Sequence, residues 1–208
     1  MDSRNTISYH IIIALGSFVL LIFLGLLGIE PNRAVPAIAF FLLFLTLIIG
    51  PIMRFWQPIV NVLPWNLPWS WRGELGIWFV IMSIAHMLFI FKGAHWDVLG
   101  YLSEMRLSNL VAFVALFWAL ILTVTSFGSV IKFIGVSSWR WLHSFAYVVF
   151  YLIGAHVINH AFLRPGRPSD WLHWTYLAMM LVIVFLQLTA FLITVKEYRK
   201  SLVKKDGD

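Results

Sequence analysis

Six long apolar segments constrain this chain more than any other feature of its sequence. A membrane-spanning helix needs roughly 20 mostly apolar residues, and polar or Pro/Gly-bearing connections separate the segments. Because only helices or closed barrels satisfy their backbones in lipid, and barrel strands alternate in polarity, these uniformly apolar runs predict an all-α fold. The six predicted spans are Ser8–Gly28, Val35–Phe55, Leu75–Phe91, Ser108–Phe127, Trp141–Leu163 and Trp171–Val195.

The composition supports the same fold class. Of the 208 residues, 61% are hydrophobic and only 12% are charged, whereas about a quarter of a soluble domain is charged. We therefore expect residues 1–208 to form one polytopic membrane domain, a six-transmembrane-helix bundle. The absence of cysteine excludes thiolate metal sites and Cys-ligated iron–sulfur clusters. No signal-peptide cleavage site follows the first apolar segment, so we expect that span to be retained.

The basic residues predict the orientation of the bundle. If the N-terminus is inside, ten of the 15 Lys and Arg residues fall in inner segments and five in outer ones, which places both termini on the inner side. The basic C-terminal segment, Lys196–Asp208, is expected to contact anionic lipid, although it could also dock an acidic partner. No basic patch suggests nucleic-acid binding. The Leu63–Trp71 stretch is predicted to form an amphipathic loop at the inner interface.

Two histidines inside predicted spans are the main candidates for chemistry, because ionisable groups are expensive in lipid. His86 follows Leu75 by 11 residues and His156 follows Trp141 by 15, or about 16 Å and 22 Å of helix. Since the two spans run in the same direction, both imidazoles are expected in the outer half of the bilayer. Two neutral imidazoles on neighbouring helices can ligate one heme iron.

Small residues next to these histidines, namely Gly154, Ala155 and Ala85, are expected to let a flat porphyrin approach the backbone. Other interpretations stay open. A membrane histidine is often an interhelical hydrogen-bonding group, and either histidine could be structural. His160, four residues beyond His156, could replace it as ligand because it lies on nearly the same helix face. His95 and His173 lie in or beside loops and are interpreted as structural.

Three segments of the chain carry a recognisable pattern of residues: Trp71–Ile77 followed by His86, Thr125–Ser126 at the end of the fourth span, and Trp139–His143 followed by Tyr147 and His156. This pattern resembles the ferric-reductase-like transmembrane family. The resemblance covers nearly the whole chain, and within the family it is greatest to the bacterial heme-binding membrane subunits of methionine sulfoxide reductase systems. One departure is Gly73, where the family motif has a second arginine.

The resemblance implies heme b and electron transfer across a bacterial inner (cytoplasmic) membrane. His86 and His156 would be the axial ligands of the heme iron. The implied donor is a cytosolic flavin reductase, with FMN as a further cofactor, or a membrane quinone. The implied acceptor is a periplasmic molybdoenzyme that reduces methionine sulfoxide. The chain would then be an electron-transfer subunit rather than a complete enzyme.

A second heme is left open by the resemblance. Two-heme relatives carry two histidines in each of the two spans, but here Arg72 lies 14 residues before His86, where the inner histidine would be. His143 is therefore a possible ligand without a histidine partner. Arg72 is interpreted as a partner for a heme propionate or flavin phosphate, or as a topology-fixing charge.

His143 and His156 are 13 residues apart, which on a straight helix separates their directions by about 140°. An irregular turn, two sites approached from different sides, or a His143 that binds no metal would each explain this.

Two other functions compete with an electron-transfer subunit. A stand-alone reductase of ferric or other metal ions, or of oxygen, would need an exposed acceptor site, for which Lys92–Leu107 offers only His95, Asp97 and Glu104. A non-redox transporter or assembly scaffold would use the histidines structurally.

Overall fold

The computed structural model describes residues 3–55, 67–164 and 169–205 of the chain, and every regular element in these ranges is helical. The all-α fold class is therefore confirmed. The long helices are α1 (Ser3–Leu26), α2 (Pro31–Phe55), α4 (Leu67–Gly93), α6 (Leu107–Val124) and α10 (Trp171–Lys205). The shorter elements are α5 (Val98–Ser103), α7 (Gly128–Ile134), α8 (Val136–His143), α9 (Ala146–Ile158) and a π-helix, η1 (Asn159–Leu163).

Six segments are long and apolar enough to cross a membrane, as predicted, which gives the chain the features of a multi-pass membrane protein. The predicted boundaries need correction where helices extend further than their apolar centres. In particular, α4 begins at Leu67, so the predicted loop at Leu63–Trp71 is helical from Leu67 onward, while residues 63–66 lie outside the described ranges. The six segments are Ser8–Leu26, Pro31–Ile52, Trp71–Gly93, Leu107–Val124, Val136–Leu163 and Trp171–Arg199.

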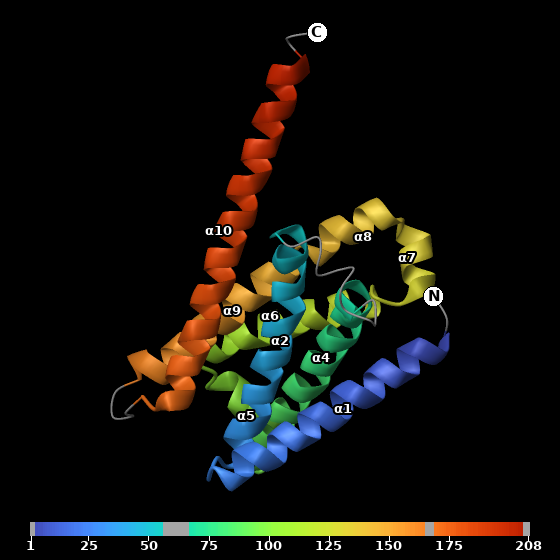
Figure 1. Cartoon of the computed structure of the whole chain (residues 1–208). Coiled ribbons are helices and arrows are strands. Elements are labelled where there is room, and N and C mark those ends of the chain that lie inside the picture. The colour runs from blue at the N-terminus through green and yellow to red at the C-terminus, as the bar shows by residue number, and fades with distance from the viewer. Residues whose placement is uncertain (1–2, 56–66, 165–168, 206–208) are drawn as a thin grey trace.

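The central helix of the bundle is α2. Of its most apolar stretch 56% is buried, against 17% for α1 and 11% for α10, and α2 packs against α1, α4, α9 and α10. Figure 1 shows α2 in the middle of the bundle, with α1 along one edge and α10 extending well beyond the other helices. The long exposed faces of α1 and α10 are apolar, as expected of helices that contact lipid.

The two ends of the bundle can be named from the course of the chain. The end where α1 begins and α10 ends, which also holds α7 and α8, is called the terminal end here (Figure 1). The opposite, or distal, end holds the α1–α2 turn, α5, η1 and the start of α10. If all six candidate spans cross the membrane, the start of α1 and the end of α10 lie on the same face, which the basic residues predict to be the inner one.

The fifth span is broken rather than straight. Helix α8 ends at His143, and α9 begins at Ala146. Between them the backbone tightens, because Phe145 N–H bonds the Leu142 carbonyl at 3.0 Å and Tyr147 N–H bonds the Ser144 carbonyl at 3.1 Å, which are i→i−3 bonds of the 3₁₀ type. This irregular turn, which lies inside the fifth candidate span, is one of the three explanations offered for the spacing of His143 and His156.

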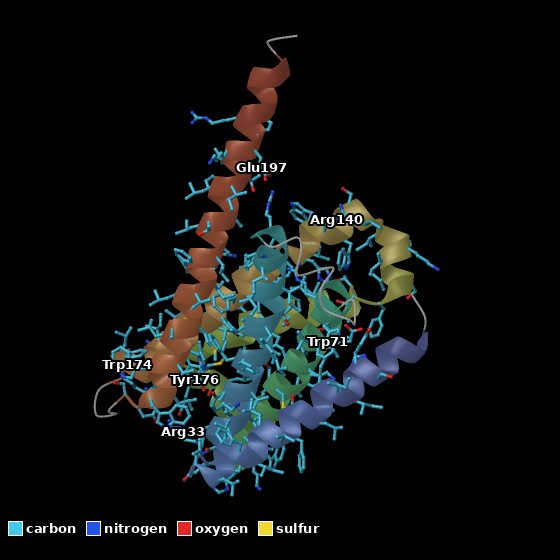
Figure 2. All side chains as sticks on the ribbon, in the orientation of Figure 1. Arg33, Trp71, Arg140, Trp174, Tyr176 and Glu197 are labelled. Carbon is cyan, nitrogen blue, oxygen red and sulfur yellow. The ribbon has the colours of Figure 1, made fainter. Side chains whose placement is uncertain are left out.

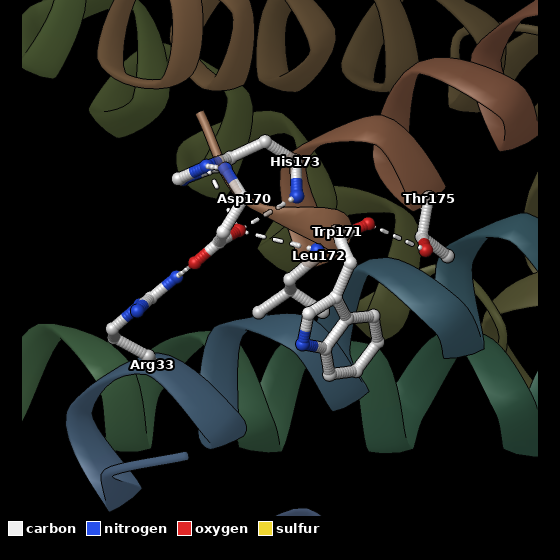
Figure 3. Close-up of polar contacts among 6 residues, drawn as sticks. All are labelled: Arg33, Asp170, Trp171, Leu172, His173 and Thr175. Carbon is white, nitrogen blue, oxygen red and sulfur yellow. Dashed lines mark hydrogen bonds and ion pairs between the residues drawn. The ribbon is translucent and has the colours of Figure 1, made fainter. Parts of the chain in front are cut away.

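An ion pair joins α2 to α10 at the distal end (Figure 3). Arg33, in the first turn of α2, bonds the carboxylate of Asp170, which immediately precedes α10. The Asp170 carboxylate also accepts the backbone N–H groups of Leu172 at 3.1 Å and His173 at 3.2 Å. In return the Asp170 N–H donates to Nδ1 of His173 at 3.1 Å, so the two residues form a reciprocal helix cap.

Partial burial alone would raise the pKa of the Asp170 carboxyl. The hydrogen bonds from Arg33 and from the His173 backbone, with the neighbouring positive charge, outweigh it and hold that pKa below its ordinary value.

Candidate heme-ligand site

His156 is held in one orientation by the backbone of a neighbouring helix. Its Nδ1 lies 2.8 Å from the carbonyl oxygen of Ser108, in the first turn of α6. Because a carbonyl can only accept, Nδ1 carries the proton, and Nε2 of the neutral ring keeps its lone pair. Metal-bound histidines are commonly oriented by such a bond from the other ring nitrogen. His156 therefore has the tautomer that a metal-ligating histidine needs.

His160 uses both of its ring nitrogens. Nε2 lies 2.9 Å from the Asn109 amide oxygen, which can only accept, and the Arg164 guanidinium donates to Nδ1 at 3.3 Å. Its ring packs on that of His156, with centroids 4.5 Å apart. Asn109 in turn donates to the Tyr101 hydroxyl at 2.9 Å. The geometry therefore favours His156 over His160 as the ligand, because no lone pair of His160 is left unused.

His86 presents a buried nitrogen with no partner. Its ring is half-buried in α4, and Nδ1 has no hydrogen bond although it is closed to solvent. Native proteins leave few such groups unpaired, and each one calls for an explanation. The charge of His156 influences His86. The two predicted ligands are therefore within electrostatic reach of one another.

The helices that carry these two histidines are not close packing neighbours. The main contacts of α4 are with α2, α1 and α6, while those of α9 are with α6, α10, η1 and α2.

The expected role of Gly154 needs correction. It is buried against α10, where an added Cβ would lie 2.9 Å from Sδ of Met180, because a residue two positions before His156 faces nearly the opposite side of the helix. Gly154 therefore serves helix packing.

A different set of side chains meets at the terminal end of the same spans. Nε2 of His143 lies 3.3 Å from the Thr125 hydroxyl, which already donates to the Ile121 carbonyl at 2.9 Å. The hydroxyl therefore accepts from His143, and Nε2 is occupied. The His143 ring also packs on Trp139 at 4.4 Å.

Arg72 lies close enough to His143 to influence it electrostatically. Its guanidinium lies beside Gly50, where the Tyr147 hydroxyl also approaches. Figure 2 shows Trp71, next in sequence to Arg72, and Arg140 at this end, whereas Arg33, Trp174 and Tyr176 lie at the distal end. Arg72, His143 and Tyr147 thus share one region, but none of them is paired with a second histidine.

Two groups near these spans are not apparent from the sequence. Ser108 contacts His156 through its backbone carbonyl, and no sequence pattern encodes such a contact. Glu74 was predicted to lie outside the third span, but α4 begins earlier, and the residue is only 5% exposed within the helix. The extended apolar and aromatic sequence before Leu75 is the signal that could have shown this.

Comparison with known proteins adds no assignment: no family model matches the chain, and no curated protein matches it significantly. Among the described residues, no three His, Asp or Glu side chains gather as a metal site would require. A heme needs only two protein ligands because the porphyrin supplies the other four. Two neutral imidazoles fit that requirement: His86, whose Nδ1 has no hydrogen-bond partner, and His156, whose ring is oriented by Ser108.

Proposed function

We propose that this protein is a membrane b-type cytochrome that carries electrons across the bilayer. His86 of α4 and His156 of α9 would be the axial ligands of one heme in the distal half of the bundle. The bound iron would supply one-electron transfer between its ferric and ferrous states. The observation that supports the proposal is the Ser108 contact, which leaves Nε2 of His156 unprotonated, within electrostatic reach of the half-buried imidazole of His86.

The roles of the surrounding residues follow from their contacts. Ser108 would keep the His156 ring from rotating and would make its Nε2 a stronger donor. His160, Asn109 and Arg164 form a hydrogen-bonded chain that backs the His156 ring on its distal side. At the other end of the bundle, Arg72 would attract a negatively charged group such as a propionate or a flavin phosphate.

The direction of electron flow follows from the predicted orientation and the family resemblance. Electrons would enter at the terminal end from an inner-side donor, either flavin, including FMN delivered by a cytosolic reductase, or membrane quinol. They would leave at the distal end for a periplasmic partner, for which a molybdenum-containing methionine sulfoxide reductase is our first choice. The protein would then lie in the inner membrane of a bacterium, in contact with anionic lipid through its basic C-terminal segment.

A difference spectrum tests this proposal directly. The full chain, purified in detergent from cells supplied with heme precursor, should show a Soret band and, after dithionite reduction, the split visible bands of a six-coordinate b-type cytochrome. Pyridine hemochrome quantification should give about one heme per chain, since two axial ligands hold one iron. A preparation with no Soret band would rule the proposal out.

A polar hollow at the distal end supports a second candidate, direct reduction of a small acceptor. The hollow has a volume of about 410 Å³, and Tyr101, Asn109 and Arg164 are among its lining residues. Asn109 and Arg164 both bond His160, which packs on His156, so a molecule bound there would be two side chains from the proposed ligand. Ferric-chelate reduction by the purified, pre-reduced chain without any partner would favour this candidate.

A further inference from the structure

The polar hollow at the distal end lies where three candidate spans have their limits. We call it the distal hollow, and its volume of about 410 Å³ is typical of small-molecule sites. The distal limits of the third, fourth and fifth spans are Gly93, Leu107 and Leu163. The residue just outside each limit lines the hollow, namely Ala94, Arg106 and Arg164. The hollow is therefore at the level of the lipid headgroups rather than within the hydrocarbon.

The lining of the distal hollow carries charges of both signs. It includes two carboxylates, two guanidinium groups, a phenol and an amide: Asp97, Glu104, Arg106, Arg164, Tyr101 and Asn109. None of these four charges forms an ion pair within the described ranges, because the ion pairs found there join Asp170 to Arg33 and to His173. The hollow therefore offers separate partners for a positive and a negative group of one ligand.

The donors of the hollow keep unused hydrogen-bonding capacity. Arg106 is exposed, and its guanidinium bonds no other described residue. Arg164 gives one N–H to His160, whereas a guanidinium has five to give. The Tyr101 hydroxyl accepts from Asn109 at 2.9 Å, so its own proton is left to donate. These three side chains together match the oxygens of a phosphate, which guanidinium groups bind well.

The two carboxylates supply acceptors. Glu104 is exposed, and its carboxylate bonds no other described residue. Asp97 uses one carboxylate oxygen to accept the Gly100 N–H at 2.9 Å, as the N-cap of α5. Its second oxygen makes no such bond. Both side chains can therefore accept hydrogen bonds from an ammonium group, which carries only donors.

Exposed apolar side chains adjoin the lining residues in sequence. Trp96, Leu99 and Leu107 are 59%, 82% and 76% exposed, and they belong to the segment around α5 at the distal end (Figure 1). Tryptophan is enriched where a membrane meets water, and exposed apolar side chains at that level contact lipid. This arrangement favours a ligand that has acyl chains as well as a charged head.

We propose that the distal hollow binds the headgroup of a phospholipid with a primary ammonium, of the phosphatidylethanolamine type. Its phosphate would accept hydrogen bonds from Arg106, Arg164 and Tyr101. Its ammonium would donate to Asp97 and Glu104. A choline headgroup has no N–H to donate, and a glycerol headgroup brings no positive charge to the two carboxylates, so both fit less well. This inference goes beyond the proposed function and does not depend on heme.

Native mass spectrometry of the delipidated full chain tests the proposal. The chain would be titrated in detergent with dioleoyl phosphatidylethanolamine, phosphatidylcholine and phosphatidylglycerol, which share their acyl chains and differ in headgroup. We expect the ethanolamine lipid to bind about 3–10-fold more tightly than the choline lipid, because its N–H groups bond the carboxylates. Equal binding of these two lipids would overturn the proposal.

Two variants with matched controls locate the site. Glu104→Gln removes one negative charge, so the preference for ethanolamine over choline lipid should fall at least about 2-fold, and the glycerol lipid should bind more tightly. Arg106→Gln removes a phosphate partner and should weaken the ethanolamine and choline lipids alike, by about 3–10-fold. Both variants should fold, because neither side chain bonds another described residue.

The controls change exposed charges at the opposite end of the bundle. Arg140→Gln matches Arg106→Gln, and Glu197→Gln matches Glu104→Gln (Figure 2). Neither control should change the ratio of ethanolamine to choline lipid binding. If Glu104→Gln keeps the full preference for the ethanolamine lipid, the lipid binds elsewhere and the proposal is wrong.

A competitor without acyl chains separates a lipid from a soluble ligand. Glycerophosphoethanolamine at the lipid's concentration should not displace the bound lipid, because it lacks the apolar contacts of the chains. Displacement by it would indicate a site for a soluble zwitterion, and displacement by ferric citrate would indicate the small acceptor of the second candidate function. Either result would overturn the lipid proposal. The same titration on protein prepared without heme should give the same selectivity, whether or not the cytochrome proposal holds.

Discussion

The distal and terminal ends of the fourth and fifth spans differ in what their histidines can do. At the distal end, a backbone carbonyl holds Nδ1 of His156 and leaves Nε2 available, with His86 close by. At the terminal end, the Thr125 hydroxyl occupies Nε2 of His143, and the neighbouring basic group from α4 is Arg72. Of the two histidines in the fifth span, His156 is hydrogen-bonded through Nδ1 and His143 through Nε2. A histidine motif alone therefore does not predict a ligand.

The connection between the ends explains part of this difference. The tightened turn at Ser144–Phe145 separates α8 from α9, so the two histidines belong to different helices. The distal end is also tied across the bundle by Arg33 and Asp170, while the long terminal part of α10 extends beyond its neighbours (Figure 1). We therefore expect the distal end, where the proposed heme ligands lie, to be more rigid than the terminal end.

The largest effect is expected from the two proposed ligands. His86→Ala and His156→Ala should each abolish the low-spin heme spectrum, because a six-coordinate iron loses an axial ligand. The loss should exceed the roughly 10–100-fold typical of changes to outer groups around a metal site. Heme per chain and the reduced-minus-oxidised spectrum measure it. His95→Ala, outside the spans, is the control and should change nothing.

A smaller effect is expected from the residue that backs His156. His160→Ala removes a packed ring and the link to Asn109 and Arg164, so heme should be retained but held less tightly, by less than about 10-fold. Heme transfer to apomyoglobin measures the retention. If His160→Ala loses the heme and His156→Ala keeps it, the ligand lies one helical turn further along.

The distal tie should contribute modestly to stability and in a pH-dependent way. Asp170→Ala removes both the cap and the ion pair and should cost about 1 kcal/mol, whereas Asp170→Asn keeps the cap and should cost less, since exposed ion pairs contribute about 0–1 kcal/mol. In the folded protein the pKa of Asp170 lies below its ordinary value. The ordinary value, which applies in the unfolded chain, is about 3.9. The contribution of Asp170 is therefore complete above about pH 5 and is lost as the pH falls through the folded pKa.

Apparent melting temperatures of the three proteins in detergent, measured from about pH 7 down to pH 3, would test this. The difference in apparent melting temperature between the unchanged chain and Asp170→Asn should shrink as the pH falls. A difference that stays constant over this range would mean that the carboxylate charge contributes nothing to the tie.

The smallest effect is expected at the terminal histidine. His143→Ala should leave heme per chain and the spectrum unchanged, because Nε2 already bonds Thr125. Pyridine hemochrome quantification is again the measurement. A fall to half of the original heme content would show a second heme at the terminal end and would remove the contrast between the two ends.

Much of the fold was predictable because it depends on composition and segment length. Six apolar stretches in a chain with few charges have to form spanning helices, and the cores of all six were located correctly. The boundaries were less predictable. Helix α4 extends back to Leu67 and α2 to Pro31, because a helix continues through polar and aromatic residues wherever the backbone remains hydrogen-bonded.

The candidate site was predictable only in part. His86 and His156 could be chosen because an imidazole in lipid calls for an explanation. The choice between His156 and His160 was not available, since both lie on nearly one face of a regular helix. It depends on which carbonyl or amide of α6 each ring meets.

The sequence by itself determined that this chain forms six apolar helices and that its imidazoles must find partners among them, because lipid satisfies neither backbone nor side-chain polar groups. Only the tertiary structure decided which nitrogen of His143 and of His156 is occupied, where the fifth span breaks, and that one Glu74 oxygen and three indole nitrogens are buried without partners. Those features depend on contacts between segments far apart in the chain, which local patterns of polarity do not encode.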